Sequence, residues 1–295
     1  MNRSITWRQR QLIISFLFIL PAIINFLVFR YIPIYKAIVA SFYEYSLLGG
    51  YGKIVGLAHY ARMLEDVVFW RSMQSTGLYV LYKVPLQITL ALGLALLLQR
   101  QTLGAAIVRS AILTPMVTSV IIVSIVWSMM YHAQNGLIQS FLVAVGIPKT
   151  AFLSNIHRAM PAIAAMMIWK DIGFSFILFI AGLKGIPETY YEAAVIDGAT
   201  SRQMLRFITF PLLRPVLMFI VVTQTIFSFQ VFVPVYQMSQ GGPLDSTKVI
   251  VYYIYQQGFR YQDMGYASAI SVVTLVLLLG ISWVQMRFLR TEEIV

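Results

Sequence analysis

Six long apolar stretches constrain this chain more than any other feature of its sequence. They cover about residues 12–32, 74–98, 105–130, 160–183, 213–236 and 265–288. A transmembrane helix needs about 20 mostly apolar residues, so each stretch is long enough to cross a bilayer. All six are predicted to be helices, because a segment in lipid must satisfy its own backbone hydrogen bonds. The sequence therefore predicts an all-α, polytopic membrane protein with residues 1–295 as one transmembrane domain. Kinks are expected at Pro85 and Pro115.

The composition supports this class and argues against several functions. The chain is 59% hydrophobic and 11% charged, with a mean hydropathy of +0.77, whereas a soluble domain carries about 25% charged residues. It has no cysteine, and its three histidines are scattered, so no metal site is expected. No nucleophile–base constellation or phosphate loop is apparent, so we expect neither an enzyme nor a bound cofactor.

The basic residues predict how the chain is oriented. The net charge is +11, and the basic residues fringe the apolar stretches, which favours orientation in a membrane over nucleic-acid binding. They are densest before the first span, between the second and third spans, between the fourth and fifth spans, and after the last span, so both termini are predicted to be cytoplasmic. Segments 33–73, 131–159 and 237–264 would then lie outside. The basic residues assigned to the inner side are Arg3, Arg8, Arg10, Arg100, Arg109, Lys184, Arg202, Arg206, Arg214, Arg287 and Arg290.

The apolar run after the N-terminal arginines could also belong to a signal peptide. It extends from Leu12 to Phe29 and no small-x-small cleavage site closes it. We therefore interpret it as an uncleaved first span in the cytoplasmic membrane.

A polar segment at about 184–212, called the elbow below, separates the fourth and fifth spans. Acidic residues open its first predicted helix, as suits a helix N-terminus, and Gly198 is expected to break that helix. The pattern predicts two short helices with an apolar and a charged face. Such a segment could also lie on lipid as an amphipathic loop. The residues that carry the pattern are Glu188, Glu192, Ala193, Ala194, Asp197, Gly198, Arg202, Ile208 and Pro211.

The order Glu192-Ala-Ala, then Gly198, Ile208 and Pro211, resembles the EAA loop in the membrane subunits of binding-protein-dependent ABC importers. The resemblance implies a type I importer permease fold and an elbow that docks into a cleft on an ATPase subunit. One departure is Phe210, where the family usually has leucine. The implied partners are a second, homologous permease, two ATPase subunits that bind the ATP and magnesium, and an extracytoplasmic solute-binding protein.

Other segments resemble the carbohydrate importers of the maltose-transporter type, and in particular the first of their two permeases. The resemblance implies a sugar substrate, with an amino acid or peptide permease as the nearest alternative. It also makes Gly241, Gly242 and Pro243 candidates for docking the binding protein. The segments are Trp169–Phe174, Ala181–Glu188, Gly241–Pro243, Tyr252–Tyr255 and Gly265–Ala269.

Polar residues within the spans are candidates for the substrate pathway. Lys170 and Asp171 lie near the middle of the fourth span, where a charge costs at least about 2.5–3.5 kcal/mol. Neighbours on a helix do not face each other, so we expect them to have different partners; alternatively, both lie near the outer interface. The fifth span combines amides with aromatic rings, which suits a sugar, although the same amides could join helices. The candidates are Lys170, Asp171, Phe174, Ser175, Gln224, Phe227, Ser228, Gln230, Tyr236 and, in the third span, Thr118 and Ser119.

A secondary carrier driven by ions is a rival from another class. Such folds tend to show repeated halves and broken helices, and the sequence indicates neither. The charged pair Lys170 and Asp171 is the feature in its favour.

Overall fold

The computed structural model describes residues 7–99 and 102–289, and these are mostly helical. Arg3, Arg100 and Arg290, which were used for the orientation, lie outside the described residues. The described chain falls into two compact units. The first unit holds residues up to Glu65 together with Ile254–Val273, and the second holds Asp66–Tyr253 together with residues from Thr274 onward.

The first unit opens with a long apolar helix. Helix α1 (Trp7–Phe26) continues through a π-helical turn (Leu27–Tyr31) into α2 (Ile32–Ala40). Pro33 lies within this continuous helix, directly after the π-helical turn, where it cannot donate to the preceding turn. The first span was therefore predicted too short at its C-terminal end: the helix reaches Ala40 instead of residue 32.

A small hairpin and a short helix complete the N-terminal part of this unit. Strand β1 (Tyr43–Ser46) pairs with β2 (Gly50–Ile54) in antiparallel register, with Tyr45 opposite Tyr51. Helix α3 (Ala58–Glu65) follows.

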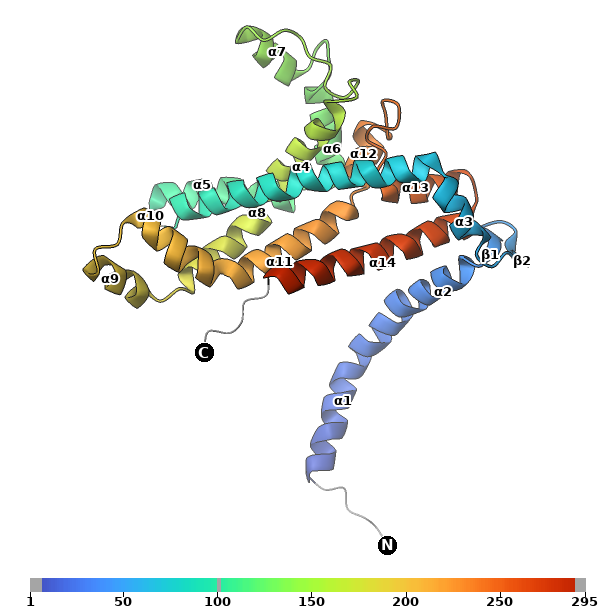
Figure 1. Cartoon of the computed structure of the whole chain (residues 1–295), viewed down its shortest axis with the longest axis horizontal. Helices are drawn as coiled ribbons and strands as arrows, with labels where there is room; N and C mark the ends of the chain where they lie inside the picture. The colour runs from blue at the N-terminus through green and yellow to red at the C-terminus, as the bar shows by residue number, and fades with distance from the viewer. Residues whose placement is uncertain (1–6, 100–101, 290–295) are drawn as a thin grey trace. The chain divides into compact units, whose positions relative to one another are not determined.

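The second unit is a bundle built around α4 (Val67–Leu97), α8 (Ala159–Lys184) and α11 (Phe210–Phe229). Figure 1 shows these helices side by side, with many contacts between each pair. Two glycines allow close approach, as is common between membrane helices. A Cβ on Gly182 would lie 2.9 Å from Leu213 Cδ2, and one on Gly173 would lie 2.9 Å from Ile112 O.

Helix α4 begins seven residues before the predicted second span. Asp66 caps it, because its side chain accepts hydrogen bonds from the backbone N–H groups of Val68 (2.8 Å) and Phe69 (3.2 Å). The helix continues through Pro85 as a single element of 31 residues.

The third span is broken instead of kinked. Helix α5 (Leu103–Leu113) ends in a 3₁₀ turn (Thr114–Val117), and α6 (Val120–Met130) leaves at 102° to it. Proline cannot donate to the preceding turn and its ring crowds the carbonyl four residues earlier, so Pro115 ends α5. Thr118 and Ser119 are then extended.

The fifth span also ends earlier than predicted. Helix α11 stops at Phe229, and a new short helix α12 (Val233–Met238) begins after three intervening residues. Pro234 accounts for the break, since it cannot bond to the carbonyl of Gln230. Tyr236 therefore lies on α12 and not on the fifth span, which corrects the prediction.

The remaining helices are short, except the last. They are α7 (Leu137–Ala144), α9 (Glu188–Ile196), α10 (Ser201–Met204), α13 (Ile250–Tyr255) and α14 (Met264–Leu289), with π-helical turns at Leu205–Thr209 and Gln256–Arg260. Helices α8 and α14 match the predicted fourth and sixth spans within one or two residues. Among the described residues, five helices are long and apolar enough to cross a bilayer, and the bent pair α5–α6 makes a sixth if counted as one span.

Candidate functional site: a polar cavity and an exposed elbow

One face of α4 carries polar side chains into the interior of the second unit. Tyr79, Lys83 and Gln87 follow one another at four-residue spacing and are at most 1% exposed. Ala91 and Ala95 continue the same face and are fully buried. Residues four apart share a helix face, so the spacing itself aligns these three polar groups.

The Lys83 ammonium group meets the carboxylate of Asp171 near the middle of α8. Lys83 Nζ lies 2.9 Å from Asp171 Oδ2, and Lys170 Nζ lies 3.7 Å from Oδ1 of the same carboxylate. Lys170 also donates to the backbone oxygen of Met116, at 3.4 Å. The two neighbours thus have different main partners, as expected, but Lys170 also approaches Asp171, which the sequence did not indicate.

Amide groups extend this ion pair into a network across three helices. Lys83 Nζ donates to Gln224 Oε1 on α11 at 3.4 Å. Gln87 Nε2 donates to the backbone oxygen of Asp171 at 3.2 Å and to Ser175 Oγ at 3.1 Å. Because buried polar groups need partners, the network fixes the positions of α4, α8 and α11 relative to one another.

A cavity of about 360 Å³ opens beside this network, and we call it the central cavity. Its volume is within the range of small-ligand sites, about 300–1,000 Å³. Aromatic rings and polar groups face it together, and the rings of Phe174 and Phe227 lie 6.4 Å apart. The lining residues are Tyr79, Lys83, Met116, Val120, Met167, Asp171, Phe174, Gln224, Phe227, Gln230, Val231, Phe232, Val233 and Pro234.

Five of the eleven sequence-derived pathway candidates line the central cavity. These are Asp171, Phe174, Gln224, Phe227 and Gln230. The others do not line it. Lys170 contacts Asp171, and Ser175 accepts a hydrogen bond from Gln87. Ser228 is buried in α11, and the ring of Tyr236 stacks on that of Phe232 at 5.4 Å. Ser119 precedes α6, and Thr118 donates to the backbone oxygen of Pro115.

Three residues that line the cavity were not predicted from the sequence: Tyr79, Lys83 and Phe232. The signal for Lys83 was available, because it is a lone charge in the middle of an otherwise apolar stretch, with polar residues four positions on either side. The break after α11, which turns Phe232 toward the cavity, was not recognised.

The elbow forms two short helices, as predicted. Pro187 precedes α9 and Glu188 lies in its first turn. Gly198 ends the helix with a φ of +75°, which side-chain-bearing residues rarely adopt. Thr200 then opens α10 in a capping box with Gln203. The Tyr191 hydroxyl lies 2.9 Å from Thr209 Oγ1 and ties α9 to the following turn.

The surface of the elbow is apolar and exposed. Val195 is 61% exposed, Ile196 86% and Phe207 67%. Glu192, Ala193, Asp197 and Arg202 are exposed beside them, while Ala194, Ile208 and Pro211 are partly buried. Contiguous exposed apolar groups rimmed by charges are typical of protein or membrane contacts.

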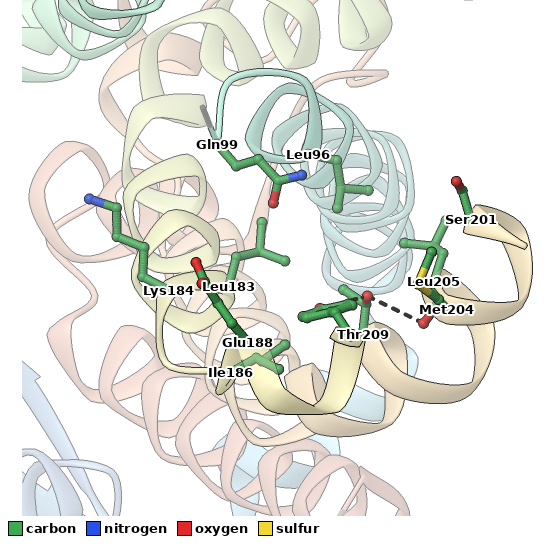
Figure 2. A pocket seen from close by; sticks show the side chains of 11 residues that line it. Leu96, Gln99, Leu183, Lys184, Ile186, Glu188, Ser201, Met204, Leu205 and Thr209 are labelled. Atoms are coloured by element: carbon green, nitrogen blue, oxygen red, sulfur yellow. Dashed lines mark hydrogen bonds between the residues drawn. The ribbon is translucent and has the colours of Figure 1, made fainter. Parts of the chain in front are cut away.

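A pocket of about 600 Å³ lies behind the elbow. Figure 2 shows its walls: Leu96 from the last turn of α4 and Gln99 just after that helix, Leu183 and Lys184 from the end of α8, and residues of the elbow itself. The dashed line marks the bond from Thr209 Oγ1 to Met204 O. The elbow therefore covers a pocket at the end of the bundle, while its Ile186, Tyr191 and Ile208 pack against the core of the bundle.

The loop that holds Gly241, Gly242 and Pro243 joins α12 to α13. Gly241 is buried with a φ of +83°, and a Cβ there would lie 3.0 Å from a ring carbon of Tyr252. Thr247 Oγ1 donates to Gly242 O at 2.7 Å. Leu244, at the tip, is 81% exposed, so the exposed apolar group of this loop follows the predicted residues.

No described group of three or more histidine, aspartate or glutamate side chains could hold a metal ion.

Residues 87–291 match the model of a protein family described as the binding-protein-dependent transport system inner membrane component. The chain belongs to this family. The permease is 38% identical over 268 residues to the probable ABC transporter permease protein YesP of Bacillus subtilis (strain 168), covering 89% of this chain and 86% of that one.

Two further comparisons cover nearly the whole permease. It is 33% identical to the lactose transport system permease protein LacF of Rhizobium radiobacter, covering 95% of each chain. Among solved structures, it resembles a bacterial ABC transporter involved in the import of the acidic polysaccharide alginate. The TM-score is 0.81 and the identity 25%, over 95% of this chain and 96% of that one. The permease is a multi-pass membrane protein with the type I importer fold.

Proposed function

We propose that this permease carries a carbohydrate across the cytoplasmic membrane as one subunit of an ATP-driven importer. The observation that carries the proposal is the central cavity, which combines the amides of Gln224 and Gln230 with the rings of Phe174, Phe227 and Phe232. Amides bond to sugar hydroxyls and aromatic rings pack against sugar C–H faces. The comparisons support a carbohydrate but leave its charge open, since lactose is neutral and alginate is acidic.

We propose that the elbow docks into a cleft on the ATPase subunit. The exposed apolar groups Val195, Ile196 and Phe207 and the adjoining charges of Glu192 and Arg202 suit a protein partner. The alternative is a lipid surface. The acidic residues Glu188, Glu192 and Asp197 offset the basic residues Lys184, Arg202 and Arg206 of the elbow, so an anionic leaflet would attract it little. The ATPase subunits would bind ATP and magnesium, and the permease itself would hydrolyse nothing.

The proposed orientation has both termini in the cytoplasm, on the same side as the elbow. It rests on the density of Lys and Arg in the inner segments. The loop at Gly241–Pro243 would then be outside, where its exposed Leu244 could contact an extracytoplasmic solute-binding protein. A second, homologous permease would complete the pathway, and the two bundles would alternate between outward-open and inward-open arrangements.

Affinity purification from native membranes in mild detergent tests the assembly. We expect the tagged permease to recover an ATPase subunit and a second permease, identified by mass spectrometry. Candidate sugars with the binding protein should then stimulate ATP hydrolysis. Recovery of the chain alone or only with copies of itself, in a detergent that preserves known importers, would contradict the proposal.

Two elbow variants test whether the elbow couples the permease to the ATPase without being needed for membrane insertion. Gly198→Asp strains the φ of +75°, and Glu192→Lys reverses an exposed charge; both are expected to reach the membrane but to lose the ATPase or its sugar stimulation. A complex that stays intact and sugar-stimulated in both variants would count against docking through the elbow.

A further inference from the structure

The buried charges beside the central cavity do not balance. Each oxygen of the Asp171 carboxylate faces a different lysine: Oδ2 lies 2.9 Å from Lys83 Nζ and Oδ1 lies 3.7 Å from Lys170 Nζ. Two ammonium groups thus share one carboxylate.

No second acid is available on the helices around this group. Asp171 is the only acidic residue within α4, α5, α6, α8, α11 and α12. The other groups bonded to the two lysines are neutral: Gln224 Oε1 for Lys83 and the backbone oxygen of Met116 for Lys170. All of them accept hydrogen bonds, which suits ammonium groups. Counted at the ordinary charges of lysine and aspartate at neutral pH, the cluster carries one excess positive charge.

An excess charge in this position calls for a counter-ion. The side chains of Lys83 and Lys170 are 2% and 10% exposed, so water screens them little, and an uncompensated buried charge is strongly unfavourable. Lys83 lines the cavity, and two of its three N–H donors point at Asp171 and Gln224. The third can serve a ligand.

We infer that the carbohydrate carried by this permease is an acidic sugar, and that its carboxylate neutralises the Lys83–Asp171–Lys170 cluster during passage. This inference rests on the proposed transport of a carbohydrate. A single excess charge matches a singly charged group such as the carboxylate of a uronic acid. A phosphate monoester carries about −1.5 to −2 at neutral pH and matches less well. The amides and rings of the cavity bind the rest of the sugar, and the cluster selects its charge.

The test uses the complete importer, with its partner permease, ATPase and binding protein, in proteoliposomes. ATP-dependent uptake is measured for labelled disaccharides of galacturonate, glucuronate and mannuronate, each against its carboxyl-reduced, neutral counterpart. We expect at least one acidic disaccharide to be taken up about tenfold faster than its neutral partner.

Variants assign that preference to the cluster instead of to the binding protein, which is unchanged in all of them. Lys170→Gln removes the excess charge but keeps the Lys83–Asp171 pair, and Lys170 does not line the cavity. It should reduce the preference for the acidic sugar about tenfold, mainly by slowing uptake of the acidic member. Lys170→Arg should retain the preference. Arg71→Gln, an equal loss of charge at an exposed site on the first turns of α4, is the matched control and should also retain it.

The outcomes distinguish this inference from the function on which it rests. Uptake of the neutral members at an equal or higher rate would overturn the acidic-sugar inference while upholding carbohydrate import; it would also indicate that the partner permease supplies the missing acid. An unchanged preference in Lys170→Gln would overturn the role of the cluster. Uptake of none of the six sugars would overturn the acidic-sugar inference. Carbohydrate import itself would be overturned only if no candidate sugar with the binding protein stimulated ATP hydrolysis by the intact complex.

Discussion

The central cavity and the elbow belong to one bundle but differ in where their side chains find partners. Around the cavity, polar and charged groups are buried, and partners within this chain satisfy most of them. At the elbow, apolar groups are exposed, and their partners must come from outside the chain. Buried polar groups must be bonded and exposed apolar patches mark contacts, so the two regions indicate a ligand site inside and a protein interface at the end.

The largest expected effect comes from breaking the buried ion pair. Asp171→Asn should destabilise the permease by about 3–5 kcal/mol, because it leaves two buried ammonium groups without a carboxylate. The melting temperature of the purified complex, followed by size-exclusion chromatography after heating, and sugar uptake should both fall.

The control for this change is Asp245→Asn, which breaks a more exposed pair, Lys248–Asp245, with side chains 13% and 33% exposed. That loss should amount to about 1 kcal/mol or less. Normal stability and transport in Asp171→Asn would contradict the claim that Asp171 compensates two buried lysines beside the cavity.

A charge introduced on the elbow should weaken binding of the ATPase and leave the stability of the permease nearly unchanged. Ile196→Asp, at a side chain 86% exposed, should change stability by less than about 0.5 kcal/mol. It should weaken ATPase binding by about 2 kcal/mol if Ile196 is an anchor of the interface. Leu244→Asp, 81% exposed in another loop, should leave ATPase binding unchanged. Titration of labelled ATPase into permease in nanodiscs measures both, and equal loss in the two variants would refute a specific elbow contact.

The hinge between the two elbow helices can be tested through Gly198. Gly198→Ala should destabilise the elbow by about 1–2 kcal/mol, because alanine is strained at a φ of +75°. Gly93→Ala in α4 meets nothing within 4 Å and should be neutral or stabilising by up to about 1 kcal/mol. If both substitutions have the same effect on protease resistance of the elbow, backbone strain is not what Gly198 relieves.

The smallest effect is expected at the cap of α10. Thr200→Ala removes the side-chain oxygen that caps the helix and should cost about 1 kcal/mol locally, whereas Thr200→Ser should keep it. Hydrogen exchange of the α10 amides should be faster in the alanine variant alone. Equal exchange in both variants would show that the capping box contributes nothing to the elbow.

The sequence predicted the helical architecture because bilayer thickness sets a length that apolar stretches reveal directly. It also predicted the two helices of the elbow, since Glu188, Gly198 and Pro211 act locally. The breaks at Thr118–Ser119 and after Phe229 were missed, because hydropathy averages over a window and continues across a proline. Whether such a proline kinks or breaks a helix depends on packing that the sequence does not display.

The candidate site was predicted in part for a related reason. Asp171, Phe174, Gln224, Phe227 and Gln230 were found because polar or aromatic groups cluster in their stretches. Lys83 was overlooked because a single lysine barely lowers the mean hydropathy of a long apolar run. Its pairing with Asp171 is a contact over 88 positions, which a local pattern cannot reveal.

That separation in the chain has a consequence for how the permease is made. During synthesis, Lys83 emerges well before Asp171, and at about 5–20 residues per second the delay is roughly 4–18 s. A lone lysine at the centre of a helix costs about 2.5–3.5 kcal/mol during translocon insertion. Helix α4 therefore carries an insertion cost that its other apolar residues must offset until α8 has been made and Asp171 can pair with Lys83.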